Sequence, residues 1–437
     1  MMRTFLYLAA TLLLWGSYAA PARAQSAGSG TIYSRYGIGS LQDFSSSQSD
    51  AMGGGGYALR SLNYTNFANP ALWSDQVYVR AAAGITYRAV RARDGRGGIN
   101  TLQTGNIRGL QFSLPLITRE LGFGLAYRPY SQYNYAAGRT GALTLDRSGE
   151  TVPYQVQFEG QGGLHQIRTG LGWRVSEWLS LGATVDGLFG ILESQRITTF
   201  QDARFNRSVV TNATRLWGLS GTAGVHITLA DVLAANDALS IGTSVTLPTA
   251  LSGRQERSTG QSLSREPVGG SVKSDVTLPW KARLGVSYQP DARWTIVADG
   301  SFAPWSNVGN PFPARVASGF PVGGADTFTN RWRASAGAEI LPAGEDNLAG
   351  YFARTAYRFG MYAERLYVSP APSVNLNEYA LTAGISLPTG GSGTRIDINT
   401  IVGTRGTTQQ NLVRDTFYGV SLNVSIGERW FLERKFR

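Results

Sequence analysis

The residue types that most often catalyse reactions or bind metals are sparse in this chain. Its 437 residues include no cysteine and only two histidines, His165 and His226. Neither histidine has an acidic neighbour at the spacing of a metal site or of a catalytic triad, so we expect structural roles for both. The absence of cysteine removes disulfides, thiolate metal sites and a thiol nucleophile together. The sequence therefore predicts no enzyme, no metal site and no cofactor.

Two other patterns that can bind ligands lack the required context. The glycine run Gly53–Gly56 has no apolar strand before it and no Lys-Ser/Thr after it, both of which a phosphate-binding loop needs. The aspartates stand too far apart for a calcium loop. A net charge of +11 is compatible with nucleic-acid binding, but no Lys/Arg cluster is interleaved with aromatic residues. We therefore expect no nucleic-acid partner.

The remaining chemistry lies in charged residues that alternate with apolar ones. We expect twelve of them to face one side of a sheet: Arg168, Arg174, Asp186, Arg283, Asp299, Arg331, Arg333, Glu339, Arg354, Arg358, Glu378 and Asp397. Buried charges need partners. We therefore predict a network among Arg168, Asp186, Arg283, Asp299, Arg333, Glu339 and Arg354, in which Arg283 pairs with Asp299 and Glu339 pairs with Arg354. The alternative is that one or two of these arginines bind an anionic headgroup such as a fatty-acid carboxylate.

The elements that position these charges have a period of two. From Val77 onwards, apolar side chains alternate with small, polar or charged ones in segments of about ten residues. Period two places each set on one face of a strand. A soluble β-sandwich would also alternate, but its strands are shorter and its second face meets bulk water. An apolar face together with a small, polar face is typical of a membrane β-barrel, with lipid outside and a crowded, wet lumen inside.

The alternation predicts an all-β, antiparallel transmembrane barrel of about fourteen strands. We place the strands at 77–88, 107–115, 121–131, 164–174, 178–188, 214–228, 238–248, 277–288, 293–303, 330–340, 351–362, 378–387, 395–403 and 415–426. The stretch 153–159 is either an extra strand or an extension above the membrane. Short and long connections alternate, and this predicts both termini on the periplasmic side of a bacterial outer membrane.

The first 24 residues have the form of a secretory signal peptide. Arg3 precedes an apolar stretch, and Ala22-Arg23-Ala24 is a small-x-small cleavage site before Gln25. No apolar stretch is long enough for a transmembrane helix. The sequence thus predicts a signal peptide at 1–24 and a barrel at 77–437. Outer-membrane lipid and the barrel-insertion machinery are the expected partners during biogenesis.

Residues 25–76, between these two parts, have neither helical nor strand periodicity. We expect this segment to lie in the lumen as a hatch, where the wall and water satisfy its backbone groups and its glycines allow close approach. Met52-Gly53-Gly54 followed by Asn69-Pro70-Ala71 resembles the hatch of the FadL/OmpP1 (TodX-like) family of outer-membrane transporters. The run Tyr33–Gly39 and the ending Trp430–Arg437 resemble Bacteroidetes-type members. Without that context the motif is also compatible with a linker and a proline turn.

The resemblance implies passive uptake of a hydrophobic small-molecule ligand, such as a long-chain fatty acid. Its motif residues are Asn69, Pro70 and Ala71. The alternative is a non-transporting outer-membrane barrel that acts as a scaffold or secretion-associated subunit. A large apolar cavity would favour transport, and a polar, blocked lumen would favour the scaffold.

Overall fold

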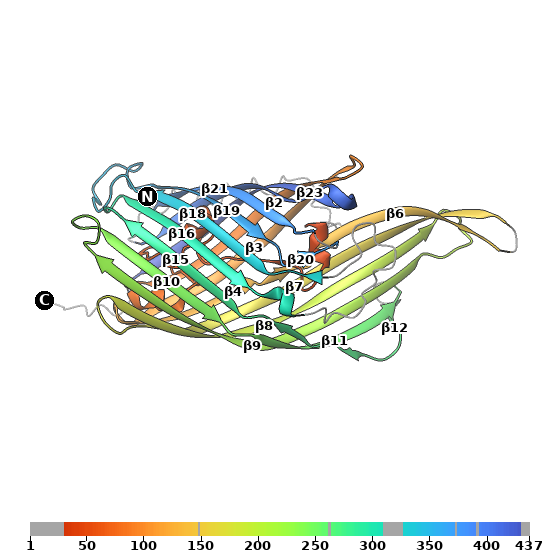
Figure 1. Ribbon diagram of the computed structural model, residues 1–437, viewed down its shortest axis with the longest axis horizontal. Coiled ribbons are helices and arrows are strands. Elements are labelled where there is room, and N and C mark those ends of the chain that lie inside the picture. Colours follow the sequence, from red (N-terminus) through yellow and green to blue (C-terminus); the bar gives the residue numbers. More distant parts are fainter. Residues whose placement is uncertain are drawn as a thin grey trace, which may run out of the picture.

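The computed structural model describes residues 30–146, 149–260, 264–308, 327–371, 374–389 and 393–429. Within these residues, fourteen antiparallel strands close a barrel (Figure 1). Around the wall they are β2 (Val79–Asp94), β3 (Ile99–Ile117), β4 (Leu121–Pro129), β7 (Thr151–Arg174), β8 (Leu179–Phe200), β9 (Ser208–Ala230), β10 (Ala238–Thr246), β15 (Lys281–Gln289), β16 (Trp294–Ala303), β18 (Arg331–Ile340), β19 (Ala356–Arg365), β21 (Asn377–Pro388), β22 (Arg395–Gly406) and β23 (Val413–Glu428). β23 pairs with β2, with Glu428 opposite Val79, and this pairing closes the wall.

Shorter elements complete the described chain. Additional strands are β1 (Ser40–Leu41), β5 (Ser131–Gln132), β6 (Tyr135–Thr144), β11 (Thr249–Thr259), β12 (Glu266–Pro267), β13 (Val272–Lys273), β14 (Val276–Leu278), β17 (Thr327–Phe328) and β20 (Val368–Ser369). The helical elements are η2 (Ile32–Arg35), α2 (Ser47–Ala51), η3 (Pro70–Asp75), η5 (Trp305–Asn307) and η6 (Gln409–Asn411).

The predicted barrel is confirmed, and each of the fourteen predicted strands overlaps one strand of the wall. The main difference is length, because β7, β8 and β9 continue well beyond the predicted segments and project from one end of the barrel together with β6 and β11 (Figure 1). The stretch 153–159 belongs to β7, where it pairs with β6 and β8, so it is an extension of a wall strand. The expected signal peptide and the C-terminal run from Trp430 lie outside the described residues.

The two faces of the wall differ as the alternation predicts. In β23, Leu422 and Val424 are 43% and 36% exposed, whereas Ser421 and Asn423 are 5% and 4% exposed. Apolar side chains therefore cover the outer face, and small or polar side chains face the lumen, which suits a wall with lipid outside. None of the described helices is long and apolar enough to span a bilayer.

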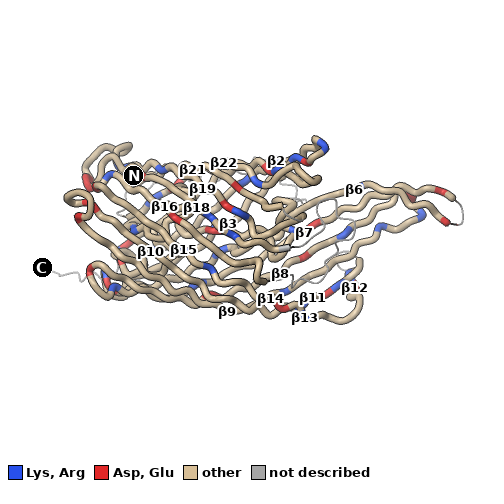
Figure 2. The backbone as a smooth tube through the Cα atoms, viewed as in Figure 1, with Lys and Arg blue, Asp and Glu red and all other residues tan. Residues whose placement is uncertain are grey.

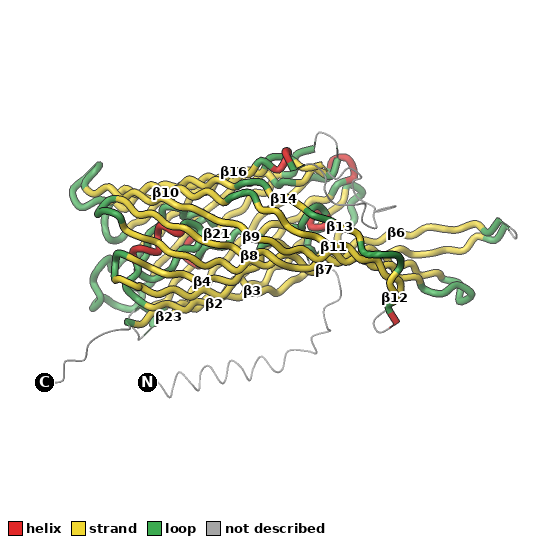
Figure 3. Tube along the Cα trace, turned by 90° about the horizontal axis from the view of Figure 1, so that it is seen from below, coloured by secondary structure: helices red, strands yellow, loops and turns green. Residues whose placement is uncertain are grey.

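Residues 30–76, here called the N-terminal segment, cross the lumen (Figure 3). α2 contacts β19, β21 and β22, and η3 contacts β4, β7, β8 and β9 on the other side of the wall. Local capping fixes both turns: the Ser46 hydroxyl accepts from the backbone of Ser49 in a capping box, and Pro70 takes the first position of η3. Without a regular ladder of its own, the segment depends on such caps and on the wall for its backbone hydrogen bonds.

An apolar cluster closes the lumen toward the projecting strands. Tyr33, Tyr36 and Ile38 of the N-terminal segment pack with side chains from the inner face of the wall and from its connections, among them Leu164 and Trp305. All five side chains are almost fully buried. The hydrophobic effect therefore helps to hold the first part of the segment in place. Smaller apolar clusters, Met52 and Leu59 with Val297 and Phe67 and Trp73 with Ala126, join the rest of the segment to the wall.

Candidate functional site

Asn69-Pro70-Ala71 joins the N-terminal segment to the wall. The Oδ1 atom of Asn69 accepts from the backbone N–H of Ala71 at 3.1 Å and so caps η3. Its Nδ2 donates to the carbonyl oxygens of Tyr57 and Val225, at 3.1 and 3.0 Å. Val225 lies in β9, so one fully buried side chain caps a turn, ties two parts of the segment together and binds the wall.

Glycines in the wall leave room for this motif. A Cβ atom at Gly182 in β8 would lie 2.4 Å from the carbonyl carbon of Pro70, and one at Gly224 in β9 would lie 2.1 Å from the Asn69 Oδ1. Both distances are far shorter than any Cβ contact. The backbone of η3 therefore packs against the wall where the wall has no side chains.

Arg168 and Asp186 form the most buried ion pair of the predicted network. They lie opposite each other on β7 and β8. Two parallel bonds of 2.6 and 2.7 Å join the guanidinium to the carboxylate. The remaining Arg168 nitrogen donates to the carbonyl oxygen of Phe67 at 2.7 Å, so the pair also holds the N-terminal segment.

Asp299 and Arg333 bind the glycine run. The Asp299 carboxylate accepts from the backbone N–H groups of Gly56 and Tyr57 at 2.7 and 2.8 Å. Arg333 donates to the carbonyl oxygen of Gly53 at 2.8 Å. The expected Arg283–Asp299 pair is wrong: within the described residues no ion pair joins them, because Asp299 accepts from the segment while Arg283 donates to Thr246 at 3.2 Å.

The pairing expected between Glu339 and Arg354 is also wrong. Glu339 lies opposite Arg358 on β19, and these two side chains form the ion pair, at 2.5 Å. Residues 350–355 form hydrogen-bonded turns before β19 begins, so Arg354 lies outside the strand. A strand start five residues later than expected selects a different arginine.

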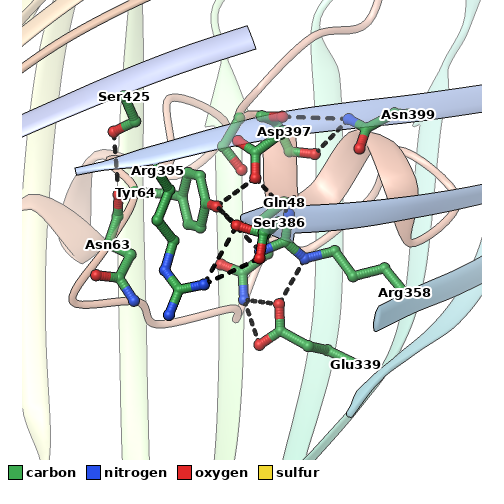
Figure 4. Close-up of polar contacts among 12 residues, drawn as sticks. Gln48, Asn63, Tyr64, Glu339, Arg358, Ser386, Arg395, Asp397, Asn399 and Ser425 are labelled. Atoms are coloured by element: carbon green, nitrogen blue, oxygen red, sulfur yellow. Dashed lines mark hydrogen bonds and ion pairs between the residues drawn. The ribbon is translucent and has the colours of Figure 1, made fainter. Parts of the chain in front are cut away.

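Arg358 is the centre of a wider network around the N-terminal segment (Figure 4). It also bonds Asp397 and the hydroxyl of Tyr64, both at 3.1 Å. Tyr64 in turn contacts Ser386 at 2.6 Å. Gln48 donates to the Glu339 carboxylate at 3.0 Å. Tyr64 and Gln48 of the segment thus add hydrogen bonds to a cluster of paired charges from three wall strands, in which Arg358 and Asp397 are fully buried.

Asp43 is an anchor that the sequence reasoning missed. Its carboxylate forms ion pairs with Lys281, at 2.6 Å, and with Arg331. Burial raises the pKa of Asp43, but the positive charges of Arg331, Lys281 and Arg333 outweigh this and hold it well below its usual range. The signal available in the sequence was Asp43 itself, since an acid in an apolar, irregular stretch requires a cation nearby.

Asn63 bridges the two strands that close the barrel. Its backbone carbonyl oxygen accepts from Arg80 in β2 at 2.7 Å and from Ser425 in β23 at 3.1 Å. The next carbonyl along, that of Leu62, also accepts from Arg80. The N-terminal segment therefore binds both sides of the β2–β23 pairing.

Several small cavities lie between the described parts of the segment and the wall. Cavities of about 70, 20, 30 and 30 Å³ lie along it. A larger hollow of about 630 Å³ is on the outer face, where Met361, Tyr379, Leu381 and Val402 are exposed. Lys/Arg and Asp/Glu positions of both signs are distributed along the wall (Figure 2). Most charges in the described lumen are thus paired, and the apolar hollow faces outward.

The histidines take part in packing. His226 is buried and its Nε2 lies 3.2 Å from the carbonyl oxygen of Ala58, while His165 stacks on Tyr127. Within the described residues, no group of three or more His, Asp or Glu side chains could hold a metal ion.

Solved structures with similar folds are outer-membrane channels. A FadL homologue of Pseudomonas aeruginosa has a TM-score of 0.57 and 12% identity, covering 89% of this chain and 99% of the other. The toluene transporter TbuX of Ralstonia pickettii has a TM-score of 0.52 and 16% identity over 88% of this chain and 98% of its own. The toluene transporter TodX of Pseudomonas putida has 0.51 and 16%, with 90% and 99% covered. Identities this low establish the shared fold alone.

Comparisons of sequence give one match. No curated protein matches the chain. A family model described as BamG matches residues 1–437.

Proposed function

The chain belongs to the BamG family, and from the filling of its lumen we propose that it is a non-transporting outer-membrane barrel that acts as a scaffold subunit of a larger assembly. The N-terminal segment is its permanent plug. One observation carries this proposal: the segment forms hydrogen bonds and ion pairs with wall strands all around the barrel.

The plug leaves no room for a hydrophobic ligand of the usual size. Ligand sites commonly enclose about 300–1,000 Å³ of largely apolar space. The cavity that lies among Asp43, Arg331 and Glu364 has about 70 Å³. A path for an acyl chain would require the plug to leave the wall.

Leaving the wall would break many buried polar contacts at once. Asn69 of the plug donates to the backbone of Val225 in the wall. Asp299 and Arg168 of the wall bond the backbone of the plug, and Arg358 bonds its Tyr64. A buried polar group left without a partner costs about 1–3 kcal/mol, and more when it is charged. The plug therefore acts as part of the wall.

The projecting strands offer a surface for a partner protein. Among the described residues, β7 is the one strand that pairs with β6, so no strand covers the other edge of β6. Strand pairing already occurs next to β6, because β5, which directly precedes β6 in the chain, pairs with β1. Strand addition to an open edge is a common mode of recognition.

The test is to extract the tagged, full-length chain from its native membrane in mild detergent and measure its size. The scaffold proposal expects a complex larger than the monomer, with a second protein at fixed stoichiometry. The same preparation, reconstituted in liposomes, should not take up fatty acids or aromatic hydrocarbons. A monomer that takes up these compounds would overturn the proposal.

The second candidate is passive uptake of hydrophobic small molecules such as long-chain fatty acids. Besides the shared fold, one feature of the wall supports it: β3 pairs with β4 only from Leu110 and Tyr127 toward one end, so the two strands separate beyond that point. Uptake by the full-length protein would have to fall in an Asn69→Ala, Pro70→Ala double variant. Absence of uptake across a panel of fatty acids and aromatic hydrocarbons rejects this candidate.

A further inference from the structure

One of the cavities beside the N-terminal segment is lined by an excess of arginines. It has a volume of about 70 Å³ and lies between residues 39–54 and the inner face of the wall. Its charged lining residues are Arg88, Arg108, Arg331, Arg333, Arg405, Asp43, Asp50, Glu364 and Glu378. Five cations thus meet four carboxylates in one small space.

Each of the four carboxylates is already paired. Asp50 pairs with Arg108, and Glu378 pairs with Arg405. The other two are shared, because Glu364 pairs with both Arg331 and Arg333. Asp43 likewise pairs with Arg331 and also with Lys281, a further cation just outside the cavity. None of these four anions remains to neutralise a fifth arginine. The buried carboxylate of Asp415 lies in an adjoining cavity with Arg88 and Arg405, and counting it together with Lys281 still leaves six cations against five carboxylates.

Arg88 is that arginine. It lies in β2, and within the described residues it makes neither an ion pair nor a side-chain hydrogen bond. Its guanidinium lies over the ring of Phe417 on β23, 5.1 Å from the ring centre. An aromatic face attracts a cation but does not neutralise it. A half-buried charge that forms no ion pair is unfavourable.

We propose that Arg88 binds a compact oxyanion, a carboxylate or a phosphate group, in this cavity. A guanidinium presents paired N–H donors that match either group. Ser421, which is buried and lines the same cavity, provides a hydroxyl beside it. The volume suits several waters or one small anion. The anion completes the charge balance between the N-terminal segment and the wall, and this role is independent of whether the barrel transports anything.

The test is a stability titration of the purified full chain in neutral detergent. The protein is first exchanged into a buffer whose only anion is a bulky sulfonate. Sodium phosphate, acetate, laurate or chloride is then added at constant ionic strength, and the unfolding midpoint is followed by tryptophan fluorescence. The wild type should show a rise in midpoint that saturates with phosphate or acetate, because a ligand that binds only the folded state stabilises it. Phosphate acting alone identifies a phosphate site, and a lower saturating concentration of laurate than of acetate identifies a carboxylate with an acyl chain.

Variants of Arg88 distinguish anion binding from a purely structural role, because the two predict opposite changes in stability when no anion is added. Arg88→Gln should abolish the saturable rise, and without added anion it should be at least as stable as the wild type, because it removes an unbalanced charge. Arg88→Lys should retain part of the rise. Arg91→Gln is the matched control, since Arg91 is an exposed residue three positions along the same strand. Heat-modifiable migration on gels verifies that each variant folds.

Three results would overturn the proposal. The first is a wild-type midpoint that does not saturate, or that responds equally to chloride and to the oxyanions, which is screening or an adventitious ion only. The second is an Arg88→Gln variant that keeps the full response. The third is an Arg88→Gln variant that is less stable than the wild type in the anion-free buffer, which would assign Arg88 a partner within the protein. If Arg88→Gln does not fold, the wild-type titration and Arg88→Lys decide the question.

Discussion

The side-chain amide of Asn69 donates to the backbone carbonyl of Val225 in β9 at 3.0 Å, across the boundary between the N-terminal segment and the barrel wall. The same side chain caps η3. Replacing Asn69 with alanine therefore removes a cap and two hydrogen bonds from the side-chain amide to the backbone carbonyls of Tyr57 and Val225. We expect a loss of roughly 2–4 kcal/mol in the free energy of unfolding. Denaturant titration of the folded, heat-modifiable form measures it.

The matched control is Asn63→Ala. The Asn63 side chain makes no hydrogen bond within the described residues, and only its backbone carbonyl binds the wall. A loss as large in this control as in Asn69→Ala would show that the side-chain contacts of Asn69 contribute nothing particular.

A methyl group at Gly182 should push η3 away from the wall. The added Cβ would lie 2.4–2.6 Å from three backbone atoms of Pro70 and Ala71. Overpacking of this kind costs about 1–3 kcal/mol. Gly187→Ala on the same strand is the control, because its Cβ would come no closer than 3.9 Å to any atom and should change stability by about 0.5 kcal/mol or less. Limited proteolysis of the N-terminal segment in both variants locates the change.

Neutralising Asp43 should remove a counter-charge from two buried cations, Lys281 and Arg331. Asp43→Asn leaves Lys281 without its carboxylate and Arg331 with only one. Removing one partner of a buried ion pair costs about 3–5 kcal/mol. The pH dependence has a definite sign. The pKa of Asp43 is held well below its usual range, so the stabilisation is complete above the unfolded pKa and is lost only as the pH falls through the lower, folded value.

Protonation of Asp43 should therefore not reduce the difference in stability between the wild type and Asp43→Asn between pH 8 and about pH 5, and should do so only in stronger acid. Equilibrium unfolding at a series of pH values tests this. A difference that already shrinks near pH 6 would mean that Arg331 and Lys281 do not hold the carboxylate charged.

A charged residue on the outer face of β23 should destabilise the protein most where that face meets the middle of the bilayer. Leu422→Arg is expected to cost roughly 2–4 kcal/mol, whereas Thr416→Arg, on the same face but near the end of the strand, should cost about 0–1 kcal/mol. Refolding into lipid vesicles measures both. Replacing the lumen-facing Ser421 or Asn423 with arginine is not a neutral comparison, because both side chains are buried against the filled lumen. Equal costs for Leu422→Arg and Thr416→Arg would contradict a membrane centred on Leu422.

The orientation in the membrane is open to chemical labelling, since the chain has no cysteine of its own. Val79 and Glu428 lie opposite each other, and the turn with Ala292 is at the same end of the barrel. We propose that this end faces the periplasm. Ala292→Cys should then react with a membrane-impermeant maleimide only after the outer membrane is permeabilised. Asp146→Cys, at the tip of the projecting β6–β7 hairpin, should react on intact cells, and the reverse pattern would invert the barrel.

The sequence predicts the wall strands well because lipid on one side imposes alternation along each of them. That constraint ends where β8 and β9 leave the barrel. From Gln195 to Thr199 polar residues occupy both faces of β8, so nothing in the pattern marks this part as a strand. The extensions are held by their pairing with each other, which a single strand's sequence does not show.

Ion pairs are harder to predict than strands because they depend on register. Glu339 meets Arg358 because β19 begins at Ala356, and a shift of four residues would have selected Arg354. Asp43 could not be placed because an irregular segment has no period from which a facing residue can be deduced. The partners of Asp299 could not be predicted either, because they are backbone N–H groups, which every residue type except proline has.

The position of Asn63 has a consequence for how the protein folds. β2 and β23 are the first and last wall strands, so their pairing has the highest sequence separation in the barrel and the greatest loop-closure entropy. Asn63 precedes the first residue of β2 by sixteen residues, and its carbonyl oxygen is bound by Arg80 of β2 and by Ser425 of β23 together. Once Asn63 lies beside β2, its carbonyl oxygen is available to accept a hydrogen bond from β23, the wall strand farthest from β2 in the sequence. The N-terminal segment can thus serve as a docking point for β23, and the last step of folding becomes a local search.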